Sequence, residues 1–490
     1  MLWPRALMFS RRSVAALASI QHRTLSTGVP PLPPPPPMPT TPAPVLLSTY
    51  IARALASYFA SAAPVGCASS LPPLPSLSGR AAYISAVAAA YAAQPGAWLT
   101  PSDLFSPHYG RGVAAFISAR HARAAPRGAP LHIVEVGSGR GTLARDILDA
   151  IAGADGALYA RTRYATLDVS PGLVSAARAT LGAAGHGPAV FTPTLGDACE
   201  EDGWAGVAQA LGASEPSTPP FILACEVLDN LPHDRVERVD GEDGAASAWA
   251  QAEVVWGGPG GGAPPVEVLR PLADPVIEAC LVAALEGGPR SAPPPSLLAR
   301  LADFALGEGP PPWAPPAPAD PAAAACLFLP TGAARMLAAA SAAFPAHILL
   351  AFDFDALPTT LAGGGGGGGG GRAGARARAQ PCWGAPVVSG PPAPGSPAVD
   401  YPSILAAPPG TADILFPTDF GLLARLCERG WGGGEDGRVA VTTVMKSAAF
   451  FAAAPGVAAA ATASGYNPLV EDFTNTAALI VERSVGRDGV

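Results

Sequence analysis

Lysine, paired cysteines and long apolar runs are scarce in this 490-residue sequence, and each scarcity excludes a class of protein. Lysine occurs once, at Lys446, and the net charge is −8, so no basic stripe of the kind that binds nucleic acid is present. The seven cysteines are scattered and form no CxxC pair, which predicts neither a disulfide framework nor a metal site, but free thiols in a reducing compartment. The longest apolar candidate, 448–463, is shorter than a membrane span requires and contains Pro455, so no transmembrane helix is predicted.

Acidic residues are absent from the N-terminus, where the first one is Asp103. Arginine and serine are frequent there instead, with arginines at Arg5, Arg11, Arg12 and Arg23. An Arg-rich, Ser-rich and acid-free leader is typical of an organellar transit peptide. We therefore expect import into the mitochondrial matrix, with a chloroplast address and an arbitrary basic tail as the alternatives.

Glycine and proline are abundant, at 56 and 58 residues, and they are clustered. The apolar fraction of 49% is enough for a large core, although alanine supplies most of it. These patterns predict a folded core that low-complexity segments interrupt. We expect a transit peptide and Pro-rich spacer at 1–45, an N-terminal helical subdomain at 46–128, and the main domain at 129–483 with disordered Gly/Pro-rich insertions at 257–265, 286–321 and 363–397.

Strand and helix patterns alternate through the main domain, which indicates an α/β fold with a doubly wound sheet. Helices are predicted before this domain at 45–63, 80–93 and 111–124. Within it, the predicted strands are 131–136, 163–168, 189–192, 220–225, 347–352, 411–416 and 439–445, and the predicted helices are 141–152 and 171–181.

The most informative segment is Glu135-Val-Gly-Ser-Gly-Arg-Gly141, which follows an apolar strand and precedes an amphipathic helix. Glycines in this position let the chain turn sharply and leave the backbone open to a nucleotide-like ligand. A dinucleotide fingerprint would place its third glycine where Thr142 stands. Glu135 suits the ammonium of an aminocarboxypropyl group better than a pyrophosphate. The pattern resembles the first motif of class I S-adenosylmethionine (SAM) methyltransferases, and the alternative is a glycine turn that binds nothing.

Carboxylates follow the predicted strands, at the edge where ligands of doubly wound sheets bind. Asp168 ends the second strand and is placed to accept the hydroxyls of a ribose, and Asp197 follows the third and can accept from an adenine amino group. Glu226 ends the fourth strand, and Asp229 lies three residues later, so both share a face and suit a guanidinium substrate. Capping and ordinary solvated loop roles are the alternatives for these groups. His233 is more readily explained as a surface histidine than as a base.

Several motifs in order resemble the MidA family of mitochondrial SAM-dependent methyltransferases. The resemblance rests on the glycine turn and on four further segments, namely 102–110, 225–232 (Cys-Glu-Val-Leu-Asp-Asn-Leu-Pro), 348–355 and 409–420, and the tail 465–473 is similar to fungal and protist members. It implies a class I methyltransferase fold, SAM as the cofactor, and binding of SAM by Gly137, Gly139, Gly141 and Asp168. It also implies that Glu226 and Asp229 line the catalytic pocket.

The same resemblance implies a protein substrate methylated on arginine, with a complex I subunit as the partner. Two positions depart from the family pattern. Asp168 replaces its usual glutamate, and Asp353-Phe-Asp355 replaces its Asp-Tyr-Gly. A non-catalytic assembly factor that keeps the SAM-binding fold is the main alternative function. A nicotinamide-dependent oxidoreductase is a weaker one, because the glycine spacing is wrong and the chain has no Tyr-x-x-x-Lys.

Overall fold

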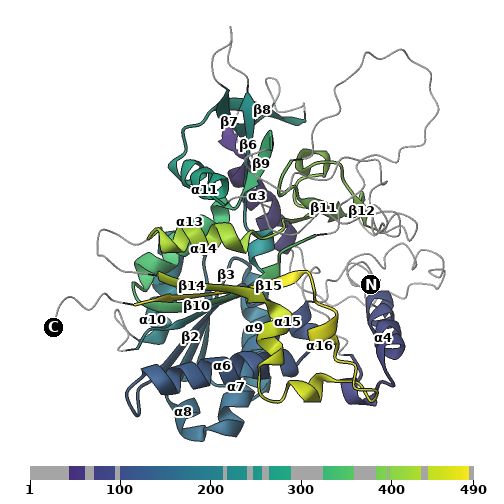
Figure 1. Cartoon of the computed structure of the whole chain (residues 1–490), viewed down its shortest axis with the longest axis vertical. Coiled ribbons are helices and arrows are strands. Elements are labelled where there is room, and N and C mark those ends of the chain that lie inside the picture. Colours follow the sequence, from purple (N-terminus) through teal and green to yellow (C-terminus); the bar gives the residue numbers. More distant parts are fainter. Residues whose placement is uncertain are drawn as a thin grey trace, which may run out of the picture.

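A seven-stranded sheet forms the centre of the protein (Figure 1). The computed structural model describes residues 43–60, 71–93, 100–212, 218–239, 247–256, 264–287, 324–357, 382–393, 396, 398–431 and 440–484. The predicted transit peptide and most of the predicted insertions lie outside the described residues. Among the described helices, none is both long and apolar enough to cross a membrane.

The central sheet has the strand order β14-β15-β10-β5-β2-β3-β4. Its strands are β2 (Leu131–Val136), β3 (Thr162–Asp168), β4 (Phe191–Leu195), β5 (Phe221–Cys225), β10 (His347–Phe354), β14 (Ala440–Lys446) and β15 (Thr476–Arg483). β10, β5, β2, β3 and β4 pair in parallel, whereas β15 is antiparallel to both of its neighbours. The strand order reverses at β2, as expected for the predicted doubly wound fold, so the ligand crevice lies beyond its carboxyl end.

Helices cover both faces of this sheet (Figure 1). One layer contains α6 (His108–Ala124), α7 (Thr142–Ala154), α8 (Gly156–Ala160) and α9 (Pro171–Ala183). The other contains α10 (Ala205–Leu211), α11 (Pro275–Leu285), α13 (Thr331–Ala343) and α14 (Phe420–Glu428). The local sequence explains where α9 begins, because Ser170 accepts a hydrogen bond from the backbone N–H of Leu173 and Pro171 occupies the first turn.

Between β5 and β10 the chain leaves the central sheet and builds a second, antiparallel one, which the sequence did not predict. Its strands are β1 (Val45–Leu46), β6 (Asp234–Val239), β7 (Ala248–Trp256), β8 (Pro265–Pro271) and β9 (Cys326–Leu329). A small third sheet contains β11 (Val387–Gly390), β12 (Val399–Asp400) and β13 (Asp413–Leu415). The short elements are η1 (Leu74–Ser76), α5 (Pro101–Leu104), η2 (Glu201–Trp204), η3 (Leu228–Asn230), η6 (Ile404–Ala406), α15 (Ser447–Ala452), η7 (Val457–Ala460) and α16 (Pro468–Glu471).

The three helices predicted at 45–63, 80–93 and 111–124 are present, as α3 (Leu47–Ala60), α4 (Arg80–Ala93) and α6. They pack into two different clusters. α3 packs against the antiparallel sheet and β13, whereas α4 and α6 pack with the central sheet. Asp234 holds the start of α3, because its fully buried carboxylate accepts hydrogen bonds from the Ser48 N–H at 2.9 Å and from the Thr331 hydroxyl at 2.7 Å.

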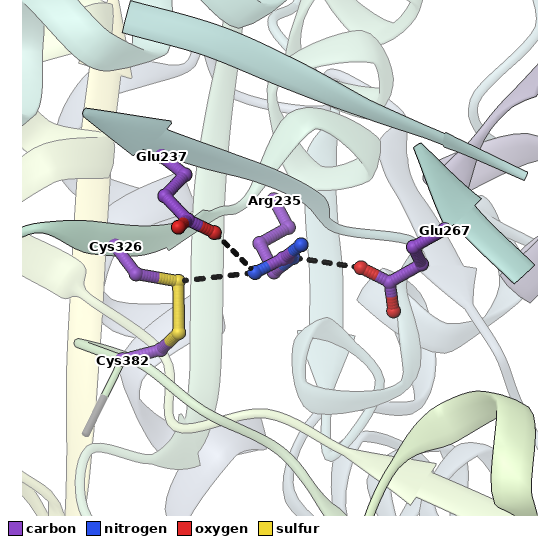
Figure 2. Close-up of a disulfide and its surroundings, with 5 residues drawn as sticks. All are labelled: Arg235, Glu237, Glu267, Cys326 and Cys382. Carbon is purple, nitrogen blue, oxygen red and sulfur yellow. Dashed lines mark hydrogen bonds and ion pairs between the residues drawn. A yellow bond between two sulfur atoms is a disulfide. The ribbon is translucent and has the colours of Figure 1, made fainter. Parts of the chain in front are cut away.

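One pair of cysteines corrects the prediction that the thiols are free. Cys326 in β9 forms a disulfide with Cys382, with 4.6 Å between their Cα atoms (Figure 2). Arg235 lies beside it, with its Nη1 3.7 Å from the Cys326 sulfur, and forms ion pairs with Glu237 and Glu267. Spacing could not reveal the pair, since the cysteines are 56 positions apart in the chain and a parallel bridge between Leu327 and Trp383 brings them together. The other cysteines within the described segments are free thiols, at 199, 225, 280 and 427.

Candidate active site

A cavity of about 600 Å³ lies at the carboxyl ends of the parallel strands. The glycine turn after β2, Asp168 at the end of β3, Asp197 after β4 and Glu226 after β5 all contribute to its lining. Residues of α3, among them Leu55 and Phe59, line it from a distant part of the sequence. The structure thus brings most of the predicted site residues to one cavity, in the order that their strands have in the sheet.

The glycine turn serves two purposes. Gly137 and Gly139 line the cavity with positive φ angles of 65° and 52°, and a Cβ on Gly137 would stand 2.6 Å from the Val227 side chain. Gly141 is not among the lining residues. It precedes α7 with φ 82°, and a Cβ there would lie 2.8 Å from Leu181 of α9. Its role in this structure is therefore the close packing of α7 on α9 rather than direct contact with the cavity.

Asp168 and Asp197 form what we call the glycine-turn side of the cavity together with Gly137 and Gly139. The Asp168 carboxylate accepts a hydrogen bond from the Ser170 N–H at 2.9 Å. Burial raises the pKa of Asp168 to about 6, against the effect of the Ser170 and Gly139 N–H donors. Asp197 accepts a hydrogen bond from the Cys199 N–H at 2.8 Å. Both side chains are therefore fixed by backbone donors and oriented at the cavity.

Glu135 is separated from this set. Its carboxylate is buried among other side chains and accepts a hydrogen bond from the Tyr164 hydroxyl at 2.8 Å. It does not line the cavity, because side chains alternate along β2 and those at 134 and 136 lie on the opposite face of the sheet. Burial raises the pKa of Glu135 to about 7. The predicted direct contact between Glu135 and a ligand ammonium does not match this placement.

Glu226 and Asp229, with Asp413 of β13, form what we call the acidic side of the cavity. Glu226 has φ 58°, a left-handed conformation that is rare for a residue with a side chain, and its carboxylate accepts a hydrogen bond from the Ser102 N–H at 3.0 Å. Such backbone outliers concentrate at functional sites. Asp229 is 3% exposed, and its Oδ1 has no hydrogen-bond partner within the described part of the chain.

The surroundings of Glu226 and Asp229 disfavour the ionised forms of their carboxyl groups. Burial raises the pKa of Glu226 well above its usual range, and the neighbouring carboxylates of Asp103 and Asp353 add to the effect. The pKa of Asp229 is raised in the same way, first by burial and then by Asp353 and Asp413. A cluster of carboxyls favours a bound cation, because the cation stabilises their ionised forms against both burial and mutual repulsion.

Sequence reasoning missed two of the carboxylates, although both lie in motifs that it had singled out. Asp353, at the end of β10, accepts hydrogen bonds from the N–H groups of Leu228 and Asp229, at 2.7 and 3.1 Å. Asp413 accepts a hydrogen bond from the Asn230 side chain at 2.8 Å. His233, expected at the surface, is 3% exposed and stacks on Phe416 with 3.9 Å between ring centroids. Burial lowers the pKa of His233 to about 4, so it is neutral at physiological pH.

Comparison with known proteins agrees with this geometry. Residues 113–367, just over half of the chain, match the family described as "Putative S-adenosyl-L-methionine-dependent methyltransferase". The fold defines a SAM-methyltransferase-like α/β protein, and the chain belongs to that family. SAM, the expected cofactor, is the cofactor of the family. No curated protein matches the sequence.

Two solved structures from Burkholderia thailandensis are similar to the chain. One, described as a "likely methyl transferase" bound to S-adenosyl-homocysteine, is 17% identical with a TM-score of 0.51, and the match covers 91% of this chain and 89% of that one. The other is an uncharacterized protein of the same superfamily, with 17% identity, a TM-score of 0.48 and the same coverage. The first establishes that the fold is shared across nearly the whole chain.

The residues present fit SAM. The glycine turn leaves the backbone open to the cavity, and a Cβ on Gly137 would crowd Val227 at that place. Gly137, Gly139 and Asp168 would hold the adenosyl part, with the Asp168 carboxylate placed to accept ribose hydroxyls. The acidic side, next along the sheet, would then lie beside the cofactor.

Proposed function

We propose that the protein is a SAM-dependent protein arginine methyltransferase of the MidA family. The observation that carries the proposal is the acidic side of the cavity, where the half-buried Glu226 and the buried Asp229 and Asp413 lie next to the cofactor-binding turn. A guanidinium group can donate hydrogen bonds to two carboxylates at once. Its positive charge favours their ionised forms, which burial otherwise opposes. A neutral acceptor would gain nothing from this arrangement.

In the proposed reaction the protein contributes mainly alignment. Bound SAM supplies the methyl group. Glu226 and Asp229 orient the acceptor nitrogen toward that methyl, which removes much of the entropic barrier to a bimolecular step. Asp229 Oδ1, which has no partner within the described residues, is placed to hold the proton that the acceptor nitrogen loses after transfer.

The location and the partner are also proposals. The Arg-rich, acid-free leader supports import into the mitochondrial matrix, with a chloroplast address as the alternative. The MidA motifs support a role in complex I assembly, with a complex I subunit as the methylated protein. The fungal and protist character of the tail at 465–473 makes that branch of the family the nearest one.

The test uses the full-length protein and methyl-labelled SAM. The protein is incubated with organelle extract from a strain that lacks it, and the labelled protein and residue are identified by mass spectrometry. We expect label on arginine, and loss of labelling in Glu226→Gln and Asp229→Asn without loss of SAM binding by calorimetry. Glu237→Gln, a partly exposed glutamate outside the cavity, is the matched control.

Three outcomes would contradict the proposal in different ways. Absence of SAM binding would remove the cofactor assignment. SAM binding without labelling, together with rescue of a deletion strain by Glu226→Gln, would identify a non-catalytic assembly factor. Label on a residue other than arginine would leave a methyltransferase with a different acceptor.

A further inference from the structure

Asp353 holds the turn that carries both predicted catalytic carboxylates. It is 1% exposed at the end of β10. Its Oδ2 accepts hydrogen bonds from the N–H groups of Leu228 and Asp229, and its Oδ1 accepts one from Phe354 at 2.7 Å. The donors at 228 and 229 belong to η3, which begins two residues after Glu226. One carboxylate therefore ties β10 to the turn between β5 and β6.

The same strand also holds Glu226 itself. The Glu226 N–H donates to the Phe352 carbonyl at 2.8 Å, two residues before the Phe354 donor. A left-handed conformation at a residue with a side chain is unfavourable and persists only where the surroundings impose it. Two adjacent residues of β10 supply that constraint. The Phe352 carbonyl holds the N–H of Glu226, and the Asp353 carboxylate holds the N–H groups of Leu228 and Asp229.

Asp353 also acts on these groups through its charge. Its carboxylate raises the pKa of Glu226 and of Asp229, in addition to the larger effect of burial. Other titratable groups also face the cluster, namely Asp103 of α5, Tyr109 of α6, Cys225 of β5 and Asp413 of β13. Asp353 combines its charge with hydrogen bonds from two backbone N–H groups of the turn, whereas Asp413 accepts one from the side chain of Asn230.

We propose that Asp353 is a positioning residue for methyl transfer, whose carboxylate fixes the turn from Glu226 to Asp229 beside the bound cofactor. The inference rests on the proposed function, in which those two residues face the acceptor. Asp353 does not line the main cavity, so it acts through the turn rather than on the acceptor. Cofactor binding, on the glycine-turn side, does not depend on it.

The test compares Asp353→Asn and Asp353→Glu with the wild-type full-length protein. The asparagine removes the charge and keeps one acceptor oxygen, whereas the glutamate keeps the charge and displaces it by one methylene. Initial rates of label transfer from SAM to extract protein are measured between about pH 5 and 9 at saturating SAM. Asp146→Asn is the control, since Asp146 of α7 is a carboxylate only 2% exposed that does not line the cavity.

We expect both Asp353 variants to lower the maximal rate by about tenfold, with an unchanged affinity for SAM by calorimetry. In the asparagine variant the acidic limb of the pH profile moves to lower pH by about one unit, because a charge that disfavours ionisation has been removed. In the glutamate variant and in Asp146→Asn the limb stays in place. An unchanged rate in both Asp353 variants would overturn the proposal, and so would a lower rate with no movement of the limb in Asp353→Asn.

If the wild-type protein transfers no label, that result counts against the proposed function. A second measurement then tests the effect of Asp353 on the turn. Infrared absorption of protonated carboxyl groups is followed against pH in the wild type, Glu226→Gln, Asp229→Asn and Asp353→Asn. The first two variants identify the bands of the turn. We expect Asp353→Asn to lower their titration midpoints, and no shift would overturn the inference. A circular dichroism spectrum matching the wild type shows that each variant is folded.

Discussion

Replacing Glu135 with glutamine tests whether the carboxyl group in the glycine motif is neutral in the folded protein. Glu135 is 3% exposed, and burial raises its pKa from the ordinary 4.5 to about 7, although the Tyr164 hydroxyl donates to it. A raised pKa means that the folded protein binds the proton more tightly than the unfolded chain does. The stability from this group is therefore complete below pH 4.5 and is lost as the pH rises through 7.

The pKa difference gives the size of the effect. At about 1.4 kcal/mol per pKa unit, it corresponds to about 3 kcal/mol of unfolding free energy between acid pH and pH 8. Glutamine keeps the acceptor for Tyr164 and does not titrate. We expect Glu135→Gln to match the wild type near pH 4.5 and to be more stable by about 3 kcal/mol at pH 8, measured by urea midpoints across that range.

Parallel pH dependence in the two proteins would refute this reasoning, because it would mean that Glu135 is already ionised in the native state. The same experiment with SAM tests the direct ammonium contact predicted from the sequence. If Glu135 held the ammonium, it would be charged in the complex and the glutamine variant would bind SAM more weakly at pH 8. From its placement away from the cavity, we expect equal SAM affinity.

Three further predictions concern packing, the cofactor and the disulfide. Gly141→Ala forces a Cβ to within 2.8 Å of Leu181 at a residue with φ 82°, so we expect urea unfolding to show a loss of about 2 kcal/mol; unchanged stability would contradict the packing role. Asp168→Ala should weaken SAM binding by about 2 kcal/mol in calorimetry, and unchanged binding would remove it from the site. Cys382→Ser should lower the free energy of unfolding by about 4 kcal/mol, because the disulfide with Cys326 closes a loop spanning 56 residues. Mass spectrometry of the purified protein checks whether the bond is present. Free thiols at both positions would favour the reducing compartment expected from the sequence.

The parallel part of the fold could be predicted from the sequence because each strand there is short, apolar and followed by a turn signal. β2 forms at the predicted residues 131–136, and β3, β5 and β10 begin within a residue of prediction. A carboxylate at or just beyond the last residue marks the carboxyl end of β3, β5 and β10, and the glycine turn marks that of β2. The local sequence pattern was sufficient to predict this part of the site, because the ends of the strands determine which side chains meet at the crevice.

The antiparallel excursion from β6 to β9 could not be predicted in the same way. Its sequence uses alanine at buried and exposed positions alike, as in β7, where Ala248 is exposed and Ala250 and Ala252 are buried. Its strands also pair across long separations, such as β1 with β7. The contact between Ser48 and Asp234, which positions α3 over the cavity, joins residues 186 apart and has no local sequence signal.

The Asp353-Phe-Asp355 motif differs from the Asp-Tyr-Gly pattern of the MidA family at its second and third positions. Asp353, which matches the family pattern, is the residue that accepts hydrogen bonds from the turn at the acidic side. Asp355, where the family has glycine, does not line the cavity, and its carboxylate pairs with Lys446, the only lysine of the chain. The negative charge that Asp355 adds in place of glycine is thus paired with Lys446 at the end of β14, outside the cavity. Of the three residues in this motif, Phe354 lines the cavity, so substitution of Phe354 is the change with which to test acceptor preference.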